Sequence, residues 1–558
     1  MEEIYVQTVT LKKLHTLVES GIFAVPELQR EFVWNARKTC DLLDSIFHKY
    51  PIGTILIWKA DRRYENQLRK HYHILPHFNP KNPHIYFLID GQQRLSVLWH
   101  LLRGEGSSVV NEYGAKLNFH DVYFDPYAQD REKEKLFVYR EHLTRELRER
   151  LVPVVDLLSV KWERRIHSHK ARATRRLKEC RRSILGYKAL LVFCETKDRS
   201  EVRQTFIRIN SLGMRIGTAD RAFARASKFD MRGRVRDIQT RLKQGFDKAS
   251  RETILQTFAS AMGVRDLGDR AIDSFISRLE TDETERIRFD RAFPKLREAI
   301  TMAVDHLVHE LRVPDFDFLP SAPMLIILSL YFFHNGNRKA TLSAKNRLKQ
   351  WFWATGVGAR YTGRGYRPNL TSDMDFVKRL AVNPKAKLSL KIKLQVQTLR
   401  STEYGRPGPV SNSFFCLLRL NKPRYLDDGS PIPEGETSSR RNSSDKHHIF
   451  PRALLSRNGI GPERFNSILN ICYLVARDNR SVGQRTPRSY FDDVPRSRRA
   501  QTLALRSHLI PSKPDKGIWD RSIKRGFKQF LLDRAWLLAI AFEKQAGIKK
   551  MFDRSEKF

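Results

Sequence analysis

Short apolar runs in the first third of the chain alternate with stretches of helical spacing. Residues 52–58, 84–89 and 189–193 are β-branched or apolar over a few positions, which is typical of buried strands. Residues 37–48, and the stretch that begins at Leu95, repeat apolar positions at i, i+3 and i+4, which predicts amphipathic helices. We therefore expect a mixed domain in which helices pack on a sheet, and an α+β class for the whole protein.

The middle of the chain changes to a purely helical pattern. Amphipathic runs such as Ile272–Leu279 and Leu325–Phe333 occur in it without a chemical motif, which predicts a spacer or regulatory bundle. The Gly/Pro/Ser-rich stretch Gly405–Ser413 is typical of a loop or linker. Because 558 residues are too many for one hydrophobic core, we predict three domains, at 1–229, 230–404 and 405–558.

The charge of the chain is strongly positive. Its 102 Lys+Arg residues against 62 Asp+Glu residues leave a formal charge of +40, which attracts phosphate polymers. A surface tuned for solubility is the alternative. Residues 161–182 alone contain ten Lys+Arg and two Glu residues. This segment predicts either a helix that lies along a nucleic-acid backbone or a solvated helix whose aliphatic stems pack on the core, and the two readings are balanced.

Several classes of protein are excluded by composition. The five cysteines are scattered and form no Cys-x-x-Cys pair, which argues against a zinc ribbon or a disulfide framework and suits a reducing cytosol. The N-terminus lacks the layout of a secretory signal, and the longest apolar runs, Met324–Phe333 and Trp536–Phe542, are shorter than the roughly 20 residues of a membrane span. We expect a cytoplasmic protein without a membrane partner, with both runs as buried helix.

The segment Asp445–Pro451 carries the strongest chemical signal. It contains His447 and His448, and Asn470 and Asn479 follow about 20 and 30 positions later. Phosphodiester hydrolysis needs an activated water and neutralisation of charge at the phosphate, for which an imidazole and a bound divalent cation are suited. The pattern predicts a hairpin, with strands at Ile449–Phe450 and 471–475, followed by a helix that begins near Asn479. The alternative is a hydrogen-bonded histidine pair in a turn.

Further along, a helix after residue 520 is expected to close the same domain. Its apolar positions are predicted to be core and not ligands, and the helix includes Phe527, Phe530, Leu531, Arg534 and Ala535.

A second polar cluster, Asp90–Arg94, lies where a buried strand becomes a helix. It brings together a carboxylate, a glycine, two amides and a guanidinium. Gly91 permits close approach of a phosphate, and Arg94 can bind a phosphate through paired N–H groups. The alternative is a helix cap, which is a common use of polar residues at this place.

These motifs together resemble the GmrSD-type restriction systems. The resemblance is carried by Val25-Pro26-x-x-Gln29-Arg30-x-Phe32-Val33-Trp34, Tyr50-Pro51-Ile52-Gly53, Ile89–Leu95 and Phe206-x-Arg208-Ile209-Asn210-x-x-Gly213. The C-terminal pattern is similar to that of His-Asn-His (ββα-metal) nucleases, including the nuclease domain of GmrSD-type systems. The two resemblances together cover roughly 60% of the chain. They imply a fold similar to the ParB/sulfiredoxin fold at the N-terminus and a ββα-metal fold at the C-terminus.

The resemblance also implies roles for individual residues. In the C-terminal domain His448 is implied as the general base, with His447 as a metal ligand and Asp445 as an alternative ligand. Asn470 is implied as the residue that orients either the base or the loop, and Asn479 as the residue that completes the metal site. In the N-terminal domain Asp90 is implied in catalysis or metal binding. The residues implied on the nucleotide are Gly91, Gln92, Gln93, Arg94, Arg208 and Asn210. Gln29 and Arg30 are implied at a surface that senses DNA modification; their structural alternatives are a tie that holds the loop and an ion pair with Asp41 or Asp44.

The function that follows is a modification-dependent or modification-sensing DNA endonuclease of bacterial anti-phage defence, which nicks or cuts DNA. Hydrolysis of a nucleoside triphosphate, GTP or another, would regulate Mg²⁺- or Mn²⁺-dependent cleavage. Partners would be DNA, expected to be modified phage DNA, and the nucleotide, while homo-oligomer formation stays open. The alternative is a nucleic-acid-binding regulator or clamp that binds nucleotide without turnover and carries a decayed nuclease.

Overall fold

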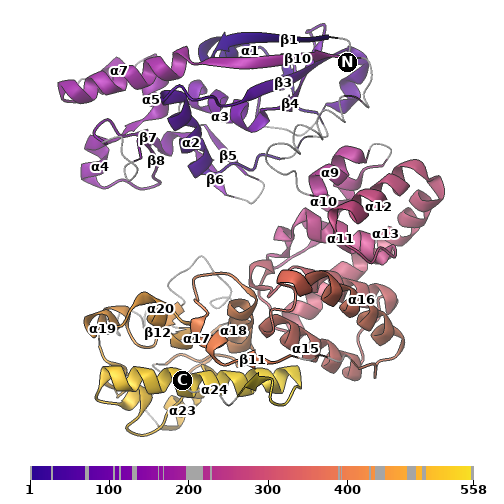
Figure 1. The fold of residues 1–558 in the computed structure, drawn as a ribbon, viewed down its shortest axis with the longest axis vertical. Helices are drawn as coiled ribbons and strands as arrows, with labels where there is room; N and C mark the ends of the chain where they lie inside the picture. Colours follow the sequence, from indigo (N-terminus) through magenta and orange to yellow (C-terminus); the bar gives the residue numbers. More distant parts are fainter. Residues whose placement is uncertain are drawn as a thin grey trace. The chain divides into compact units, whose positions relative to one another are not determined.

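The computed structural model describes the chain in two compact units, Met1–Ser227 and Lys228–Phe558 (Figure 1). The residues outside the description are 1–2, 27–28, 30, 69–73, 105–106, 112–114, 129–134, 161, 167–168, 197–200, 202–217, 227–228, 388–389, 391, 427–428, 434–445, 474–484, 493–497 and 554–558.

The first unit is built on a five-stranded mixed sheet in the order β1-β10-β3-β4-β2. Its strands are β1 (Glu3–Thr10), β2 (Phe23–Ala24), β3 (Thr54–Ala60), β4 (Ile85–Asp90) and β10 (Lys188–Glu195). β10 pairs parallel with β3 and antiparallel with β1, while β4 pairs antiparallel with β3 and parallel with β2. The three strands predicted from apolar runs are confirmed. The edge strand β1 was not predicted, because its residues are mostly exposed and lack an apolar run.

Helices cover the larger apolar face of this sheet. They are α1 (Leu11–Glu19), α2 (Ala36–Phe47), α3 (Gln92–Arg103), α5 (Val154–Leu158) and α7 (Ala171–Gly186). The sheet contributes alternate residues to that core, among them Ile55, Ile57, Leu88 and Leu191. The opposite face carries a smaller cluster that includes Trp58, Phe87 and Ile89. The two helices predicted at 37–48 and from Leu95 are confirmed as α2 and α3.

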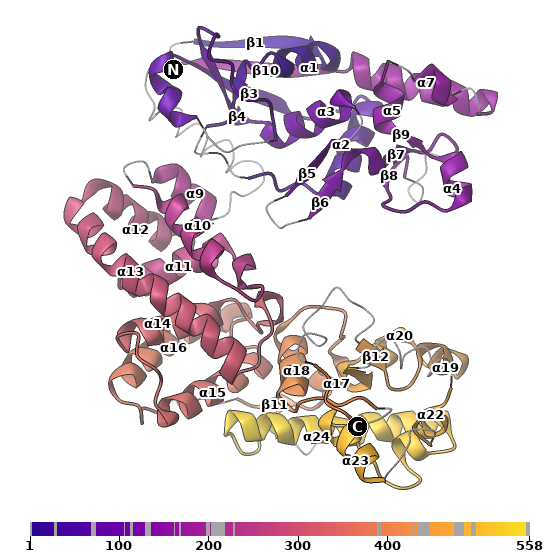
Figure 2. The same ribbon diagram turned by 180° about the vertical axis from the view of Figure 1, so that it is seen from behind.

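The remaining elements of the first unit are short. Two small sheets contain β5 (Ser108–Val110), β6 (Lys116–Asn118), β7 (Val122–Phe124), β8 (Phe137–Tyr139) and β9 (Val152–Pro153), and the other helices are α4 (Arg145–Arg150), α6 (Glu163–Ile166) and α9 (Thr218–Arg225). Figure 2 shows α7 projecting from the edge of the unit, beside the strands β7 and β9.

The second unit begins with a helical bundle around α14 (Pro323–His334), which packs on α11, α13 and α16. Ten of its twelve residues are buried, so the prediction of a buried helix at Met324–Phe333 is confirmed. Among the described residues, no helix is long and apolar enough to cross a membrane. The other helices of the bundle are α10 (Met231–Arg241), α11 (Arg251–Ala261), α12 (Asp269–Thr281), α13 (Glu283–Asp305), α15 (Leu342–Val357) and α16 (Tyr366–Val382).

The C-terminal part of the second unit holds shorter elements around the long helix α24 (Ile523–Ala546). α24 and α18 (Pro409–Leu420) both pack on α15, so helices on either side of residue 404 share a core, and the division into domains there remains a prediction. The other elements are β11 (Leu394–Gln395), α17 (Gln397–Ser401), β12 (Lys446–His448), α19 (Arg452–Arg457), α20 (Pro462–Phe465), β13 (Ile471–Tyr473), α22 (Pro487–Asp492), α23 (Arg498–Ser507) and β14 (Phe552–Asp553).

One local prediction is wrong. The stretch Gly405–Ser413 was predicted to be a loop, but α18 begins at Pro409 and includes Ser413. Proline is well tolerated in the first helical turn, where its missing N–H has no intrahelical partner. Gly408 therefore ends the loop, and the small residues Ser411 and Ser413 are buried inside the helix. The chain as a whole is a multidomain α+β protein, as the sequence predicts.

Candidate active site

The two histidines lie on a short β-hairpin in the second unit. β12 pairs antiparallel with β13, with His448 opposite Ile471 and His447 opposite Cys472. The backbone N–H of Ile449 extends the ladder by donating to the carbonyl of Asn470 at 2.8 Å. The predicted pairing of two strands is confirmed, but the first strand is Lys446–His448, and Ile449 and Phe450, where that strand was predicted, form a bend after it. Of the predicted second strand, residues 471–473 are confirmed as β13, and residues 474–475 lie outside the described residues.

Asn470 fixes the end of the strand that carries His448. Its side chain is fully buried and uses both ends of the carboxamide. Oδ1 accepts from the backbone N–H of Phe450 at 2.8 Å, and Nδ2 donates to the carbonyls of Phe450 at 3.1 Å and Phe465 at 3.0 Å. These bonds join three segments of chain that would otherwise leave buried backbone groups unpaired. Asn470 therefore positions the loop after His448, which is one of the two roles the resemblance implies.

The His448 side chain is enclosed by neighbouring side chains, and the residue is 8% exposed. Its Nε2 lies 3.1 Å from Oδ1 of Asn466, and its ring stands nearly perpendicular to that of Tyr404, with ring centres 5.2 Å apart. Phe465 packs edge-on against it at 6.3 Å. Because Oδ1 of Asn466 accepts only, Nε2 of His448 donates in this contact. When the imidazole is neutral, Nδ1 is then the ring nitrogen that can accept a proton.

A second layer of support comes from Arg534 on α24, which is fully buried. Its guanidinium donates to the carbonyls of Leu469 and Ile471 at 2.7 Å each, of His508 at 2.9 Å and of Leu509 at 3.2 Å. Burial lowers the pKa of Arg534 to about 10. The hydroxyl of Tyr490 donates to the carbonyl of Ile449 from the other side. The predicted core positions of α24 are buried as expected, and Arg534 serves as a polar anchor among them.

The other residues implied at this site are less fully described. Asp445 and Asn479 lie outside the described residues, and of His447 only the backbone is described. Among the described residues, no group of three or more histidine, cysteine, aspartate or glutamate side chains could hold a metal ion. The donor set implied for a cation, an imidazole with amide and carboxylate oxygens, suits Mg²⁺ or Mn²⁺, and it stays a prediction.

In the first unit, Asp90–Arg94 forms the junction of β4 and α3. Gly91 has φ +89°, and a Cβ there would lie 3.0 Å from a side-chain carbon of Ile55 on the neighbouring strand. Both facts require glycine, since other residues rarely adopt this conformation. The motif thus makes a sharp turn in which the backbone of the helix start packs directly on β3.

The two glutamines of the junction face inward. Gln92 is 3% exposed and Gln93 is 8% exposed. Oε1 of Gln93 accepts from the N–H groups of Val33 at 2.9 Å and Trp34 at 3.3 Å, and its Nε2 donates to the carbonyl of Glu31 at 3.0 Å. Gln93 therefore holds the 31–34 loop against α3.

Gln29 has a similar structural contact. It is buried, and its Nε2 donates to the carbonyls of Leu88 at 2.9 Å and Ile89 at 2.7 Å. These contacts agree with the structural alternative, in which Gln29 ties down its loop. Arg30, Arg208 and Asn210 lie outside the described residues, so their implied roles stay predictions.

Arg94 and Asp90 form an ion pair at the start of β3. Nη2 of Arg94 lies 3.0 Å from Oδ2 of Asp90 and also donates to the carbonyl of Thr54 at 2.9 Å, while Nη1 donates to the carbonyl of Ile52. Gly53, with φ +83°, makes room for the guanidinium: a Cβ at this position would lie 2.4 Å from Nη1. The Arg94 side chain is 16% exposed, whereas that of Asp90 is 37% exposed. Asp90 is thus the more accessible ionisable group of the motif.

A cavity of about 810 Å³ shares residues 52–54 with the surroundings of this ion pair, although Asp90 and Arg94 themselves do not line it. Ile52, Gly53 and Thr54, the residues that Arg94 contacts, form part of its wall. The rest of the lining comes from the end of α2, the C-terminal half of α7 and the start of β10, and its charged residues are Lys49, Glu179, Arg182 and Lys188. The cavity is large enough for a mononucleotide-sized ligand.

The comparisons agree with the predicted family for this unit. Residues 11–226 match the family model described as the GmrSD restriction endonuclease, N-terminal domain. Residues 11–226 are therefore a GmrSD-type N-terminal region, and the restriction endonuclease family of that model suggests nuclease activity and DNA as a partner. An uncharacterized protein of Methanocaldococcus jannaschii, MJ0686, is 21% identical over 512 residues, which cover 85% of this chain and 84% of that protein.

Sequence reasoning missed several residues that build these sites. Asn466 and Tyr404 contact His448 but belong to no recognised spacing, and Arg534 was expected only as part of a core helix. The one available signal was an arginine at a core-facing position of α24, since a fully buried arginine must be paired or hydrogen-bonded. The sequence motif Tyr50–Gly53 indicates no role for Gly53, but the close contact of Gly53 with Arg94 provides one.

Proposed function

We propose that this protein is a metal-dependent DNA endonuclease of anti-phage defence, regulated by nucleoside triphosphate hydrolysis in its N-terminal domain. The observation that carries the nuclease proposal is the support around His448: Asn466 contacts its imidazole, and Asn470 fixes the backbone that follows it at the end of the hairpin strand. The GmrSD-type N-terminal region supports the restriction context. DNA modification would be sensed by the same N-terminal domain.

In the proposed mechanism His448 accepts a proton from the attacking water through Nδ1, while Asn466 holds Nε2. Asn470 and Arg534 keep the carbonyls and N–H groups of the surrounding loops paired, so that the imidazole does not shift during the reaction. His447, Asn479 and Asp445 would hold the divalent cation. That cation would neutralise charge on the phosphate and the leaving oxygen.

In the N-terminal domain, Asp90 would orient water or a cation beside the phosphates of a bound nucleotide. The cavity next to Arg94 offers a volume suited to that nucleotide, and Lys49, Arg182 and Lys188 would contribute positive charge. Gln93 and Arg94 would act by holding the 31–34 loop and the start of β3, because their polar groups already have backbone partners.

The nuclease proposal is tested with supercoiled plasmid and Mg²⁺ or Mn²⁺. Loss of the general base in His448→Ala is expected to lower cleavage by about 100-fold or more while DNA binding is retained. His142→Ala, at an exposed position of the first unit, is the matched control and should cleave as the parent does. Equal cleavage by the parent and His448→Ala, with both proteins folded, would refute the role of His448.

The nucleotide proposal is tested by phosphate release from GTP, ATP and CTP. Asp90→Asn is expected to abolish release, and Asp61→Asn, which removes an exposed carboxylate that lies 3.4 Å from Arg63, should leave it unchanged. A panel of modified and unmodified phage DNAs, with and without nucleotide, then tests coupling. Cleavage that is indifferent to both variables would contradict regulation while leaving the nuclease assignment intact.

A second candidate for the N-terminal domain is a nucleotide clamp without turnover. The observation that favours it is the closed Asp90–Arg94 pair, in which the guanidinium is bound to two backbone carbonyls and the carboxylate. For this candidate, parent protein would bind nucleotide in equilibrium dialysis but release no phosphate, and Asp90→Asn would change affinity alone.

A further inference from the structure

Helix α7 has two faces on which arginine is used in different ways. Its buried residues Ala173, Leu177, Cys180 and Ile184 recur at helical spacing and pack on the core of the first unit. Arg176 and Arg181 flank this apolar stripe and are partly buried, whereas other basic residues of the helix are exposed. The two groups allow the structural use of arginine to be separated from a binding use.

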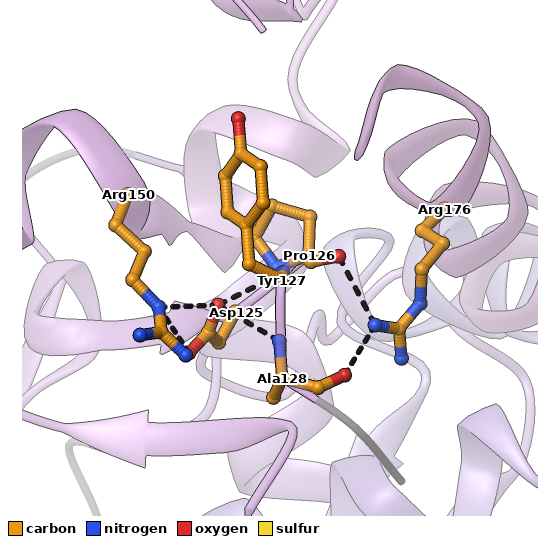
Figure 3. A network of polar contacts seen from close by, with 6 residues as sticks. All are labelled: Asp125, Pro126, Tyr127, Ala128, Arg150 and Arg176. Atoms are coloured by element: carbon orange, nitrogen blue, oxygen red, sulfur yellow. Dashed lines mark hydrogen bonds and ion pairs between the residues drawn. The ribbon is translucent and has the colours of Figure 1, made fainter. Parts of the chain in front are cut away.

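The flanking arginines hold neighbouring loops. Figure 3 shows the guanidinium of Arg176 directed at a tight turn, where it donates to the carbonyls of Pro126 and Ala128. The same turn is closed from its other side by Asp125, which binds Arg150 at 2.8 Å. Arg181 likewise donates to two carbonyls, and burial lowers its pKa. The guanidinium groups of Arg176 and Arg181 therefore already have hydrogen-bond partners, and these bonds attach α7 to the rest of the unit.

The outer face carries a row of basic side chains: Arg172, Arg175, Lys178 and Arg182. Their spacings of three, three and four residues place them on one side of the helix. Within the part of the chain that the structure describes, none of the four makes an ion pair or a side-chain hydrogen bond. The row spans about 15 Å, because a helix rises 1.5 Å per residue. Within α7 itself, Glu179 is the one acidic residue.

The row leads to the cavity described above. Arg182 lies at its end and also lines the cavity, together with Lys49 and Lys188. Against Glu179, the charged lining therefore has an excess of two positive charges. Because the exposed row and the cavity share Arg182, they form one continuous basic surface, which we call the α7 track: Arg172, Arg175, Lys178, Arg182, Lys188 and Lys49.

We infer that the α7 track binds the phosphate backbone of duplex DNA and brings the duplex to the mouth of the cavity in the N-terminal unit. A row of about 15 Å matches about four base pairs at 3.4 Å each, so three or four phosphates can contact it. A row of unpaired cations on a rigid helix favours a regular polyanion over a single phosphate, and such contacts carry no base specificity. The inference rests on the proposed function for its choice of DNA as partner, but it requires neither cleavage nor nucleotide hydrolysis.

The test is binding of the full chain to a short unmodified duplex in EDTA, over a series of salt concentrations. Each lost phosphate contact lowers the slope of log K against log salt by about 0.9. Arg172→Gln/Arg175→Gln/Lys178→Gln is therefore expected to lower the slope by about 2 to 3 and the affinity by at least about tenfold. The matched control, Lys81→Gln/Lys116→Gln/Arg140→Gln, removes three exposed charges outside the track and should leave the slope within about 0.5 of the parent.

Three outcomes would overturn the inference. An unchanged slope for the α7 variant would show that DNA binds elsewhere, and equal losses in both variants would show a general charge effect. Loss of binding to phosphatidylserine vesicles, with DNA binding retained, would assign the track to a membrane surface. Circular dichroism and thermal melting establish that each variant is folded. Because the assay contains no divalent cation, a failed nuclease proposal would leave its result unaffected.

Discussion

In both candidate sites, side chains hydrogen-bond to the backbone near the end of a strand, but the residues that do so are distributed differently along the chain. In each, a carboxamide side chain binds backbone groups near the end of a strand: Gln93 in the first unit and Asn470 in the second. At Asp90–Arg94, however, most supporting groups are contiguous in sequence. Around His448 they come from Tyr404, Asn466, Asn470 and Arg534, which are widely separated in the chain.

The difference shows that polar residues that are adjacent in the sequence do not all face a ligand in the structure. Within Asp90–Arg94, Gly91 makes a turn, and Gln93 and Arg94 bind backbone, which leaves Asp90 as the most accessible ionisable group. The ring of His448, by contrast, is contacted by Tyr404, Phe465 and Asn466, which no local pattern indicates. We therefore expect substitutions in the second unit to affect folding and the site together, and those in the first unit to separate the two.

The largest expected effect is at Arg534. Arg534→Met leaves four buried carbonyls without their donor, and we expect the free energy of unfolding of the second unit to fall by about 4 kcal/mol. The loss is smaller than the sum of four bonds because burial already disfavours this charge, as its lowered pKa indicates. Urea denaturation followed by tryptophan fluorescence measures the change. Lys528→Met, at an exposed position of the same helix, should shift it by less than about 0.5 kcal/mol.

Asn470 comes next. Asn470→Ala removes three buried hydrogen bonds and should cost about 3 kcal/mol of stability. If His448 is the general base, cleavage measured below the melting temperature should also fall by about 100-fold, because the histidine strand is displaced.

Asn466→Ala is the matched variant, with one bond lost to the imidazole. It should alter the pH dependence of cleavage more than stability, and the reverse pattern would contradict the support assigned to these residues.

The loss of stability at acid pH can be compared directly between the two units. Burial lowers the pKa of His100 in the first unit and of His508 in the second from 6.5 to about 4. Between these pH values the unfolded chain binds more protons than the folded chain, so stability falls as pH falls from 6.5 toward 4. Each group should contribute a loss of about 3 kcal/mol. Melting temperatures measured across this range should fall less steeply in His100→Gln or His508→Gln, and a profile unchanged by both substitutions would refute the burial effect.

The smallest effect is expected at Gly53. Gly53→Ala places a Cβ at φ +83° and against the Arg94 guanidinium, which should cost about 1 to 2 kcal/mol. In the double variant Gly53→Ala/Arg94→Ala the contact is absent. Its loss of stability should therefore be smaller than the sum of the losses in the two single variants. Strict additivity, measured by denaturation of all four proteins in the cycle, would show that the guanidinium does not depend on this glycine.

The sequence by itself determined the elements whose apolar pattern is local. The strands β3, β4 and β10 and the helices α2, α3 and α14 follow from their hydrophobic periods, whereas the spacing of the histidines and asparagines indicated the hairpin but not the bounds of its first strand. The weakly patterned strand β1 and the start of α18 did not follow, because one lacks an apolar run and the other begins with residues that also favour loops.

Only the tertiary structure decided which polar groups face a ligand and which hold the fold. Gln93 finds its partners about 60 residues away, and Arg534 finds two of its partners more than 60 residues away. Such pairings depend on how the chain returns to itself, and they carry no sequence period. The same reason separates Arg176 from Arg175 on α7: the two arginines are adjacent in sequence, but only the surrounding fold supplies carbonyls to Arg176 and leaves Arg175 exposed.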